Sequence, residues 1–507
     1  IFKFPIAEQI CSMVTEMCLS IGSFDCHCLH RFSVVSERSH FSQNSKQPCF
    51  YLFRRKGEPP LVSGRLLWGN AAEFSMNAVK YLLEWRKEYG KVFTLRLINK
   101  HMTVIMDPHN YEAFSKVRAF DFDPIQKQVN LNVFSFVLKD ARNMIKETGK
   151  TVRGHALQAG MKQFAGNLRD SCRDITSTMK QDHTPTEIGL RTFTMKTMFT
   201  AIFDTVFGKS NGHPFEPEMV YHSFEMYHRY FNYLWLGFPR ALFPKAGKAL
   251  ESLLCHPKSG ELLGREDCSD YIKYAVQYML DRGQNEVEIL GHNLVYLHVN
   301  YNTFRLSFWA LAYLLEDPKS FAALRNEVRT AIEAKTVTSE DTALFSMKEV
   351  EDLDILKSFR LSSGVFMVRY INEDTWHEVD GKKMLFRQGD RVAIYPPAIH
   401  KDPEIFEDPM EFKYDRFCNE AKFYKDGREL KHPIMAFGSL CTGQRYATLQ
   451  AKWYLMNIVN MFEINLLEGE KAVVDVQYHG HEILPPVNDV KCNFSLAKSF
   501  NPIDFSD

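Results

Sequence analysis

The cysteine in "AFGSLCTGQRYATLQ", residues 436–450, is placed where a thiolate could do chemistry. From Arg445 onward apolar residues recur every three or four positions, as on one face of a buried helix, so Cys441 lies near a helix N-terminus. There the helix dipole and unpaired backbone amides lower the pKa of a thiol, and Gly443 lets the backbone approach whatever the sulfur touches. Such a thiolate is suited to be an axial ligand of haem iron. The alternative is packing, because free cysteine often behaves as a small buried hydrophobe. The apolar positions are Tyr446, Leu449, Trp453, Met456 and Val459.

Composition limits the classes of protein that could position such a cysteine. The chain has 507 residues and a 45% hydrophobic fraction, which is ordinary for a globular protein with a large core. Lys plus Arg and Asp plus Glu number 62 each, so the charge balance gives no indication of a nucleic-acid partner. The 11 cysteines are odd in number and scattered, which argues against a disulfide scaffold and favours a reducing compartment.

The elements expected around Cys441 are mainly helical, with small β-sheets. "VFTLRL" and "HMTVIM" predict a β-hairpin, and residues 110–350 are predicted to be mostly helical. Further β-rich stretches are "SGVFMVRY", "DRVAIY" and "DVKCNF". We expect one domain over residues 51–507. Residues 1–50 form an atypical N-terminal segment with no clear anchor, because their most apolar run contains Glu16 and is too short to span a bilayer.

Seven segments together resemble a known family. The hairpin and six motifs stand in the order and rough spacing found in the cytochromes P-450, and the resemblance covers residues 50–500. The chain is most similar to the branch that holds the sterol 7α-hydroxylases, the sterol 12α-hydroxylase and prostacyclin synthase. "RLSSGVFMVR" is similar to the 7α-hydroxylases, so a sterol 7α-hydroxylase is the first expectation. The motifs are "GEPPL", "NTFRLSFWALAYLLEDP", "RLSSGVFMVRYINED", "VAIYPPAIHKDPEIFEDPMEFKYDRF", "CTGQRYA" and "ILPPVNDV".

The resemblance implies a haem bound through Cys441, whose thiolate would favour O–O cleavage. It places Phe437 and Gly443 in the haem-binding loop. It also implies that Arg369 meets a haem propionate, a contact that suits the fixed fork of donors on a guanidinium. The alternative for Arg369 is a solvated charge at a strand end.

The resemblance assigns proton delivery to Asn302 and Thr303, at a kink in a long helix over the oxygen site. Prostacyclin synthase rearranges a peroxide without activating dioxygen and lacks this threonine, so Thr303 favours hydroxylation. The alternative is that its hydroxyl is bonded to the carbonyl four residues earlier.

The remaining expected site residues are structural or substrate-facing. Arg360 and Arg416 are expected in a structural network behind the haem. Five residues are expected to face the substrate, and the alternative for each is a plain core position. These five are Ser363, Val365, Phe366, Ile483 and Leu484.

The partners and location also follow from the resemblance. It implies a sterol or oxysterol substrate in bile-acid or steroid metabolism, and electrons from NADPH through a separate reductase. It further implies a monomer held at the cytoplasmic face of the endoplasmic reticulum membrane.

Three departures from the family pattern keep other functions open. Phe437 and Cys441 are four residues apart where the family has seven, which shortens the haem loop by roughly 10 Å of reach. Lys357 stands where a glutamate should pair with Arg360, and Tyr301 replaces a small residue beside Asn302. The alternatives are a non-catalytic relative that binds haem poorly and a peroxide isomerase like prostacyclin synthase.

Overall fold

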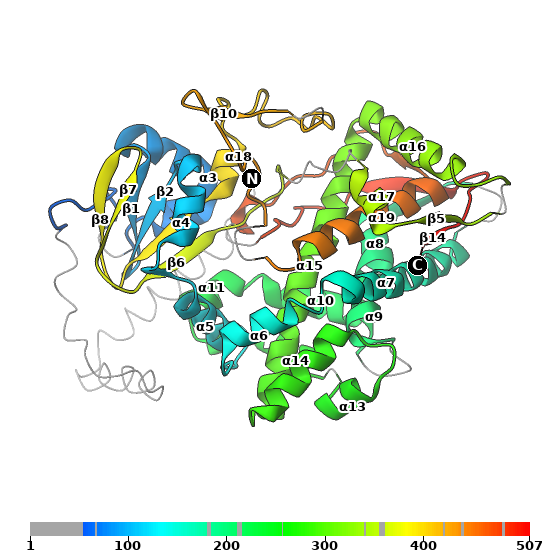
Figure 1. Cartoon of the computed structure of the whole chain (residues 1–507), viewed down its shortest axis with the longest axis horizontal. Helices are drawn as coiled ribbons and strands as arrows, with labels where there is room; N and C mark the ends of the chain where they lie inside the picture. The colour runs from blue at the N-terminus through cyan, green and yellow to red at the C-terminus, as the bar shows by residue number, and fades with distance from the viewer. Residues whose placement is uncertain are drawn as a thin grey trace. The chain divides into compact units, whose positions relative to one another are not determined.

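A five-stranded sheet and a long central helix organise the fold (Figure 1). The computed structural model describes residues 54–65, 68–179, 184–209, 215–255, 257–338, 341–353, 360–418, 421–437, 441–478 and 482–506. Arg55–Asp507 make one compact unit. The expectation of a mainly helical protein with small sheets is confirmed. The N-terminal segment, residues 1–50, lies outside the described residues.

The five-stranded sheet has the order β1-β2-β9-β6-β3. β1 and β2 form the predicted hairpin, with Val92 opposite Ile105, and β9 joins β2 in parallel. Their alternating Val, Ile, Phe and Leu side chains bury both faces of the sheet. The strands are β1 (Val92–Leu97), β2 (Lys100–Ile105), β3 (Phe120–Asp121), β6 (Met367–Ile371) and β9 (Arg391–Ile394).

The remaining strands form a three-stranded sheet, β12-β13-β4, and three two-stranded sheets, β7-β8, β10-β11 and β14-β5. The C-terminal β-rich stretch predicted from the sequence is β13. Their bounds are β4 (Thr186–Gly189), β5 (Ala343–Phe345), β7 (Thr375–Val379), β8 (Lys382–Phe386), β10 (Tyr424–Lys425), β11 (Arg428–Glu429), β12 (Phe462–Leu466), β13 (Lys491–Leu496) and β14 (Ile503–Phe505).

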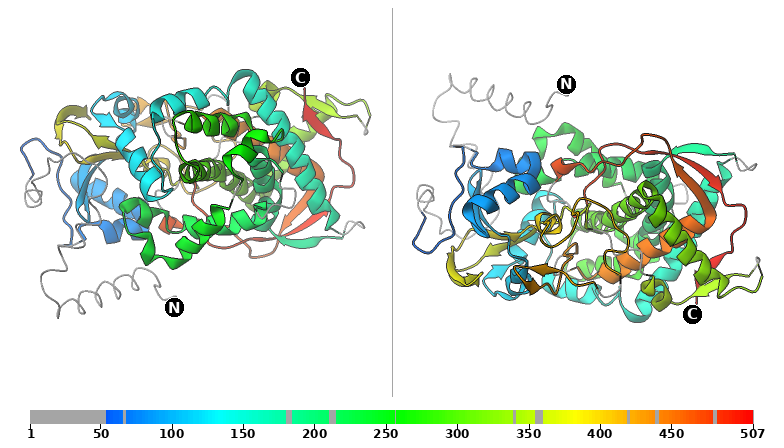
Figure 2. Two further views of the ribbon diagram at one scale, coloured as in Figure 1. Left: turned by 90° about the horizontal axis from the view of Figure 1, so that it is seen from below. Right: turned by 90° about the horizontal axis from the view of Figure 1, so that it is seen from above.

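Most helices lie at the end opposite the five-stranded sheet, an arrangement that both views in Figure 2 retain. α3 and α18 pack against each other beside the sheet. The helices are α3 (Ala71–Tyr89), α4 (Tyr111–Lys116), α5 (Asp123–Asn132), α6 (Ala141–Thr148), α7 (Gly154–Ser177), α8 (Leu190–Thr194), the π-helical turn η2 (Met195–Phe199), α9 (Thr200–Phe207), α10 (Pro217–His228), α11 (Phe231–Leu236), α12 (Pro244–Leu253), α13 (Ser259–Gly264), α14 (Asp270–Asp281), α15 (Glu286–Glu316), α16 (Pro318–Glu333), α17 (Met347–Asp352), α18 (Pro396–His400) and α19 (Gln444–Met461).

The central helix, α15, begins and ends at clear sequence signals. Asn285 and Glu288 form a capping box, each side chain accepting a hydrogen bond from the backbone N–H of the other at 3.0 and 3.1 Å. α15 ends at Glu316, because Pro318 has no backbone N–H to donate within it, and Pro318 starts α16 instead. α15 is buried on nearly all sides, as expected of a helix with apolar residues all round.

α19 confirms the helix predicted after Cys441. It begins at Gln444 and ends where Phe462 enters β12. The five periodic apolar residues named above are all buried, and so are the intervening residues from Leu449 to Val459. α19 is therefore a core helix, and it packs directly against α15.

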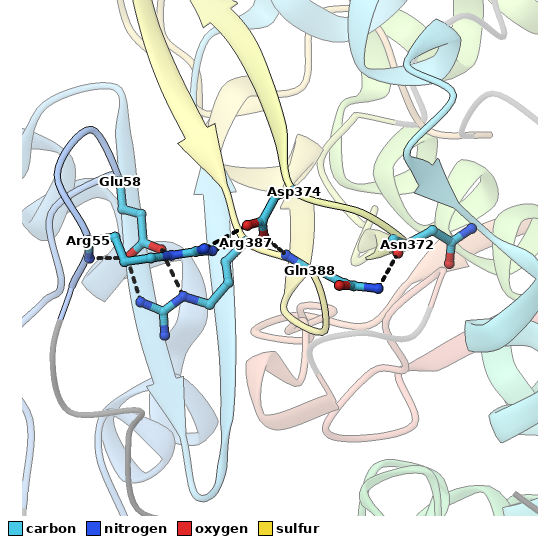
Figure 3. Close-up of polar contacts among 6 residues, drawn as sticks. All are labelled: Arg55, Glu58, Asn372, Asp374, Arg387 and Gln388. Carbon is cyan, nitrogen blue, oxygen red and sulfur yellow. Dashed lines mark hydrogen bonds and ion pairs between the residues drawn. The ribbon is translucent and has the colours of Figure 1, made fainter. Parts of the chain in front are cut away.

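A charged network fixes the first described residues to the ends of the β7-β8 hairpin (Figure 3). Arg387 donates two hydrogen bonds to the buried carboxylate of Glu58, at 2.7 and 2.8 Å, and Arg55 donates to Glu58 and to Asp374. Gly57 has φ +91°, and a Cβ there would lie 2.5 Å from the ring of Trp376, so only glycine fits this turn. Within the described ranges, no helix is long and apolar enough to cross a bilayer.

Candidate active site

The packing of α15 against α19 brings the predicted haem ligand and the predicted proton-delivery residues to neighbouring elements. Cys441 lies three residues before the start of α19. Thr303 lies in the middle of α15 and is only 4% exposed. The two elements in contact therefore carry a thiol just before the start of α19 and a buried hydroxyl and an amide on α15.

The environment of the Cys441 thiol differs from the one expected from the sequence. Desolvation raises the pKa of this thiol, even though part of the side chain is exposed at the surface. The backbone amides of Gly443 and Gln444 hydrogen-bond to the sulfur and lower the pKa, as predicted, but the carboxylate of Glu482 raises it further. The net shift in the pKa of Cys441 is upward, so the predicted lowering is wrong.

Asn302 and Thr303 lie on an uninterrupted part of α15. The Asn302 side chain donates to the carbonyl of His298, four residues earlier, at 3.4 Å. Among the described residues the Thr303 hydroxyl makes no such bond to the Val299 carbonyl, whereas Ser307 donates to the Thr303 carbonyl at 3.0 Å. A side chain bonded to the carbonyl four residues earlier, the alternative considered for Thr303, is therefore found at Asn302 and not at Thr303. α15 is helical from Glu286 to Glu316 without an interruption, so the expected kink is not observed.

The Tyr301 ring does not occupy the position that the sequence suggested. Residues two apart on a helix point in nearly opposite directions, so Tyr301 and Thr303 occupy different faces of α15. The fully buried ring packs against Phe199 and Phe224, and its hydroxyl donates to Glu225 on α10 at 2.5 Å. Tyr301 therefore joins α15 to α10.

The predicted substrate-facing residues come from two segments that the structure brings side by side. Ser363 and Ile483 form an antiparallel bridge. Two further bonds extend it, from the Leu484 amide to the Ser362 carbonyl and from the Gly364 amide to the Glu482 carbonyl, each 2.9 Å long.

This pair of segments is attached to α15. Arg305 donates to the Ile483 carbonyl at 3.0 Å, and the Trp309 indole N–H donates to the Leu484 carbonyl at 2.7 Å. The side-chain hydroxyls of Ser362 and Ser363 are buried without a hydrogen-bond partner in the described structure. Two unsatisfied hydroxyls are costly in a core, and they are consistent with a site that receives another group.

Val365 and Phe366 continue from this pair toward the sheet. Val365 belongs to the core on one face of the five-stranded sheet. The ring of Phe366 packs against Phe74 and Tyr395, with centroids 5.6 and 5.1 Å away. Val365 and Phe366 therefore make core contacts, which was the alternative to facing the substrate.

Arg369 is buried at 7% exposure, so the solvated strand-end alternative is excluded. Its guanidinium lies between the rings of Phe114 and Phe122, with centroids 5.4 and 5.0 Å away. Burial lowers the pKa of Arg369. A buried cation of this kind is suited to a carboxylate such as a haem propionate.

Arg360 and Arg416 belong to one hydrogen-bond network, and their partners in it are backbone carbonyls. Arg360 donates to the carbonyls of His400, Pro409 and Glu411, and Arg416 donates to that of Glu411 as well. Lys357 lies outside the described residues.

His400 was not identified from the sequence, although it lies within one of the quoted motifs. It is fully buried, its carbonyl accepts from Arg360, and its Nε2 accepts from the Met435 amide at 3.0 Å. Burial lowers the pKa of His400 to about 3, so the ring is neutral. Through His400, the Arg360 network is therefore connected to Met435, two residues before Phe437. Phe437 and residues of α4 line a cavity of about 330 Å³. Residues 438–440 of the shortened loop lie outside the described residues.

These residues fit a haem as judged by their chemistry. The sulfur receives two backbone amides, which can satisfy the lone pairs of a thiolate, and a buried guanidinium is present for a propionate. The described part of the chain contains no group of three or more His, Cys, Asp or Glu residues that could hold a metal ion.

The comparisons with known proteins identify the class. The family profile named Cytochrome P450 matches residues 59–254 and 303–486, well over half of the chain. The chain belongs to this family. Its fold is similar to that of the retinoic-acid-bound cyanobacterial CYP120A1, with a TM-score of 0.63, 18% identity and coverage of 87% of this chain and 99% of that one.

Curated relatives narrow the branch. The chain is 29% identical to cholesterol 7-alpha-monooxygenase of Cricetulus griseus and 28% identical to 7-alpha-hydroxycholest-4-en-3-one 12-alpha-hydroxylase of Homo sapiens, covering 87% of this chain and 94% of each relative. It is 26% identical to prostacyclin synthase of Bos taurus, covering 87% and 95%. The predicted branch of sterol hydroxylases and prostacyclin synthase is confirmed.

Proposed function

We propose that this protein is a haem-thiolate monooxygenase that hydroxylates a sterol or oxysterol at the 7α position. The observation that carries the proposal is the position of Cys441 just before α19, because α19 packs against α15, the helix that carries Thr303 and holds the 482–484 segment. The resemblance of "RLSSGVFMVR" and the similarity to cholesterol 7-alpha-monooxygenase support the 7α position.

Each residue has a defined task in this reaction. When bound, the haem supplies the activation of dioxygen and the cleavage of its O–O bond. Cys441 is the residue that would hold the iron, and Arg369 would neutralise a propionate. Asn302 and Thr303 hold protons beside the oxygen site. The overall reaction consumes one dioxygen, two electrons and two protons for each C–H bond converted to C–OH, and it releases one water.

The paired segments 362–366 and 482–484 position the substrate in this proposal. Their apolar residues provide surface for a largely apolar molecule, and burial of such surface stabilises by about 25 cal/mol per Å². The hydrogen bonds from Arg305 and Trp309 hold the backbone of 483–484 against α15. Substrate and proton-delivery residues therefore share one rigid support.

The electron source and the location are parts of the same proposal. Electrons come from NADPH through a separate reductase, and the protein works as a monomer at the cytoplasmic face of the endoplasmic reticulum membrane. Its pathway is bile-acid or steroid metabolism. The support for these points is the family membership and the named relatives.

Two alternatives have specific observations behind them. Similarity to prostacyclin synthase favours a peroxide isomerase, and Thr303 opposes it. The short chain between Phe437 and Cys441 favours a relative that binds haem poorly and is not catalytic.

One assay separates the three functions. The protein is supplied with haem and either an oxysterol or a prostaglandin endoperoxide, with or without NADPH and reductase, and the products are identified by mass spectrometry. A 7α-alcohol formed only with dioxygen and reductase supports the proposal. Rearrangement of a prostaglandin endoperoxide without reductase identifies the isomerase, and haem-free protein with no product identifies the non-catalytic relative.

A further inference from the structure

A cavity of about 180 Å³ lies between α7, the start of α14 and the start of α19. None of the described residues that line it lines the cavity beside Phe437 or belongs to the paired segments 362–366 and 482–484. The residues assigned above to haem and substrate therefore leave it unexplained. Its lining residues are Thr151, Val152, Ala156, Leu157, Ala159, Gly160, Gln163, Glu266, Cys268, Ser269, Asp270, Tyr271 and Tyr446.

The Tyr446 hydroxyl faces this cavity and has no hydrogen-bond partner among the described residues. Tyr446 is only 7% exposed, so its ring is almost completely removed from solvent. A Cβ on Gly160, which lines the cavity from α7, would lie 3.7 Å from the Tyr446 hydroxyl oxygen. The glycine therefore keeps open the space in front of the hydroxyl. Buried polar groups are nearly always hydrogen-bonded, so this hydroxyl marks a position for another group.

A second phenol, that of Tyr271, lines the same cavity. Tyr271 is 8% exposed, and its oxygen accepts from Nδ2 of Asn300 on α15 at 2.9 Å. Its own O–H proton has no acceptor in the part of the chain that the structure describes. Burial raises the pKa of both tyrosines, and the nearby Tyr446 adds to the rise at Tyr271, so both hydroxyls keep their protons at neutral pH. The buried end of the cavity therefore has O–H donors in excess of acceptors.

The other walls limit the chemistry of a ligand. The first turns of α7 contribute two alanines, a leucine and a glycine, which offer little to a cluster of water molecules because each water needs two to four polar partners. Glu266 and Asp270 are exposed at the rim, and their carboxylates disfavour an anion. A cavity of about 150 Å³ in another protein takes up benzene, so this volume suits a molecule built on one small ring.

We propose that this cavity binds a small, neutral and mostly apolar molecule whose carbonyl oxygen accepts a hydrogen bond from the Tyr446 hydroxyl. The apolar part of the molecule packs against the small side chains of α7, and the oxygen supplies the acceptor that the buried phenols lack. A cation brings donors where donors are already in excess. The inference goes beyond the proposed function, because the site needs neither haem nor a sterol.

Titrations of the full chain, followed by ligand-observed NMR, test the site with matched compounds. Cyclohexanone carries the carbonyl oxygen, and methylenecyclohexane has nearly the same shape without it. We expect cyclohexanone to bind at least about 5-fold more tightly, because the hydrocarbon covers a buried hydroxyl without pairing it. Cyclohexanecarboxylate and cyclohexylammonium should both bind more weakly than cyclohexanone.

Tyr446→Phe removes the donor and keeps the ring, so it should reduce the preference for cyclohexanone to below about 2-fold. Tyr454→Phe is the matched control. Tyr454 lies on the same helix and is fully buried, but its hydroxyl is within hydrogen-bond distance of Thr194 and Thr197 and does not line the cavity. This variant should keep the full preference.

A pair of glycine variants on α7 tests the space in front of the hydroxyl. Gly160→Ala places a methyl group there and should weaken cyclohexanone binding by at least about 3-fold, since close-packed interiors tolerate little added volume. A Cβ on Gly166 meets no atom within 4 Å, so Gly166→Ala should leave binding unchanged.

Four results overturn the inference. Equal binding of cyclohexanone and methylenecyclohexane removes the hydrogen bond. Tighter binding of the ammonium or the carboxylate assigns a different chemistry to the cavity. A full preference in Tyr446→Phe places the bound cyclohexanone elsewhere in the protein. No binding of any of the four compounds leaves the cavity to water.

Discussion

Arg360 and Arg416 donate to the same backbone oxygen, the carbonyl of Glu411, at 3.1 and 3.4 Å. Each guanidinium also donates to another carbonyl, Arg360 to that of His400 and Arg416 to that of Glu407, so neither depends on the shared oxygen alone. The ring of Phe406 lies 4.8 Å from the Arg360 guanidinium. Burial and the neighbouring Arg416 lower the pKa of Arg360 to about 10. Among the described residues, carbonyl oxygens take the role that the family pattern gives to a glutamate.

Arg360→Ala tests this network. The change leaves the carbonyls of His400, Pro409 and Glu411 without their buried donor, so we expect the free energy of unfolding to fall by about 3 kcal/mol or more. Denaturant unfolding gives the value. Arg329→Ala removes an exposed arginine and should change it by less than about 0.5 kcal/mol. A loss below about 1 kcal/mol for Arg360→Ala would show that the carbonyls find water instead.

Glu482→Gln should make Cys441 more reactive. The carboxylate raises the pKa of the thiol, so its neutralisation lowers that pKa and increases the thiolate fraction at pH 8. Iodoacetamide labelling of haem-free protein, followed by peptide mass spectrometry, should show labelling of Cys441 a few-fold faster than in the unmodified protein. Labelling of the exposed Cys255 provides the internal control and should not change. An unchanged rate at Cys441 would mean that Glu482 does not influence the sulfur in solution.

Tyr301→Phe removes one hydroxyl from the interface of α15 and α10. Glu225 loses the donor at 2.5 Å and keeps its ion pair with Arg191, so the free energy of unfolding should fall by about 1–3 kcal/mol. Because the ring lies on a different face from Thr303, the haem spectrum of the variant should not change. An altered spectrum with unchanged stability would place the ring in the oxygen pocket.

Asp374→Asn tests the network of Figure 3 through the pH dependence of stability. The hydrogen bond from Arg55 holds the pKa of Asp374 at about 2, below its ordinary value of 3.8. A lowered folded-state pKa stabilises above pH 4 and loses its effect as the pH falls toward 2. The unfolding midpoints of the unmodified protein and the variant should therefore differ at pH 5 and converge near pH 2. Asp281→Asn, at an exposed carboxylate bonded to the neutral Gln277, is the control for the substitution itself.

The elements that could be predicted from the sequence are those specified locally. The periodic apolar residues after Cys441 define α19, and the alternating residues of "VFTLRL" and "HMTVIM" define the hairpin of β1 and β2. Amides of Gly443 and Gln444 reach the sulfur because a helix starts there. These features depend on chain geometry within a few residues.

The features that could not be predicted depend on contacts between distant residues. His298 and Glu482 are 184 residues apart, and no local pattern marks their contact. Arg360 donates to carbonyls 40 to 51 residues later in the chain. Every residue has a backbone carbonyl, so the residue types do not indicate which carbonyl will accept a hydrogen bond. The upward shift in the pKa of Cys441 has the same origin, since burial and a distant carboxylate outweigh two local amides.

The most direct test of the central claim is the spectrum of the reduced, carbon-monoxide-bound protein. Residues 51–507 are expressed with excess haem, reduced and exposed to carbon monoxide. The red-shifted Soret band of a thiolate-ligated haem is expected, because a thiolate donates more electron density to iron than an imidazole does. Cys441→Ser should abolish the band, and Cys418→Ser should leave it unchanged. A band that persists in Cys441→Ser, or protein that takes up no haem, would contradict the assignment of Cys441 as the ligand.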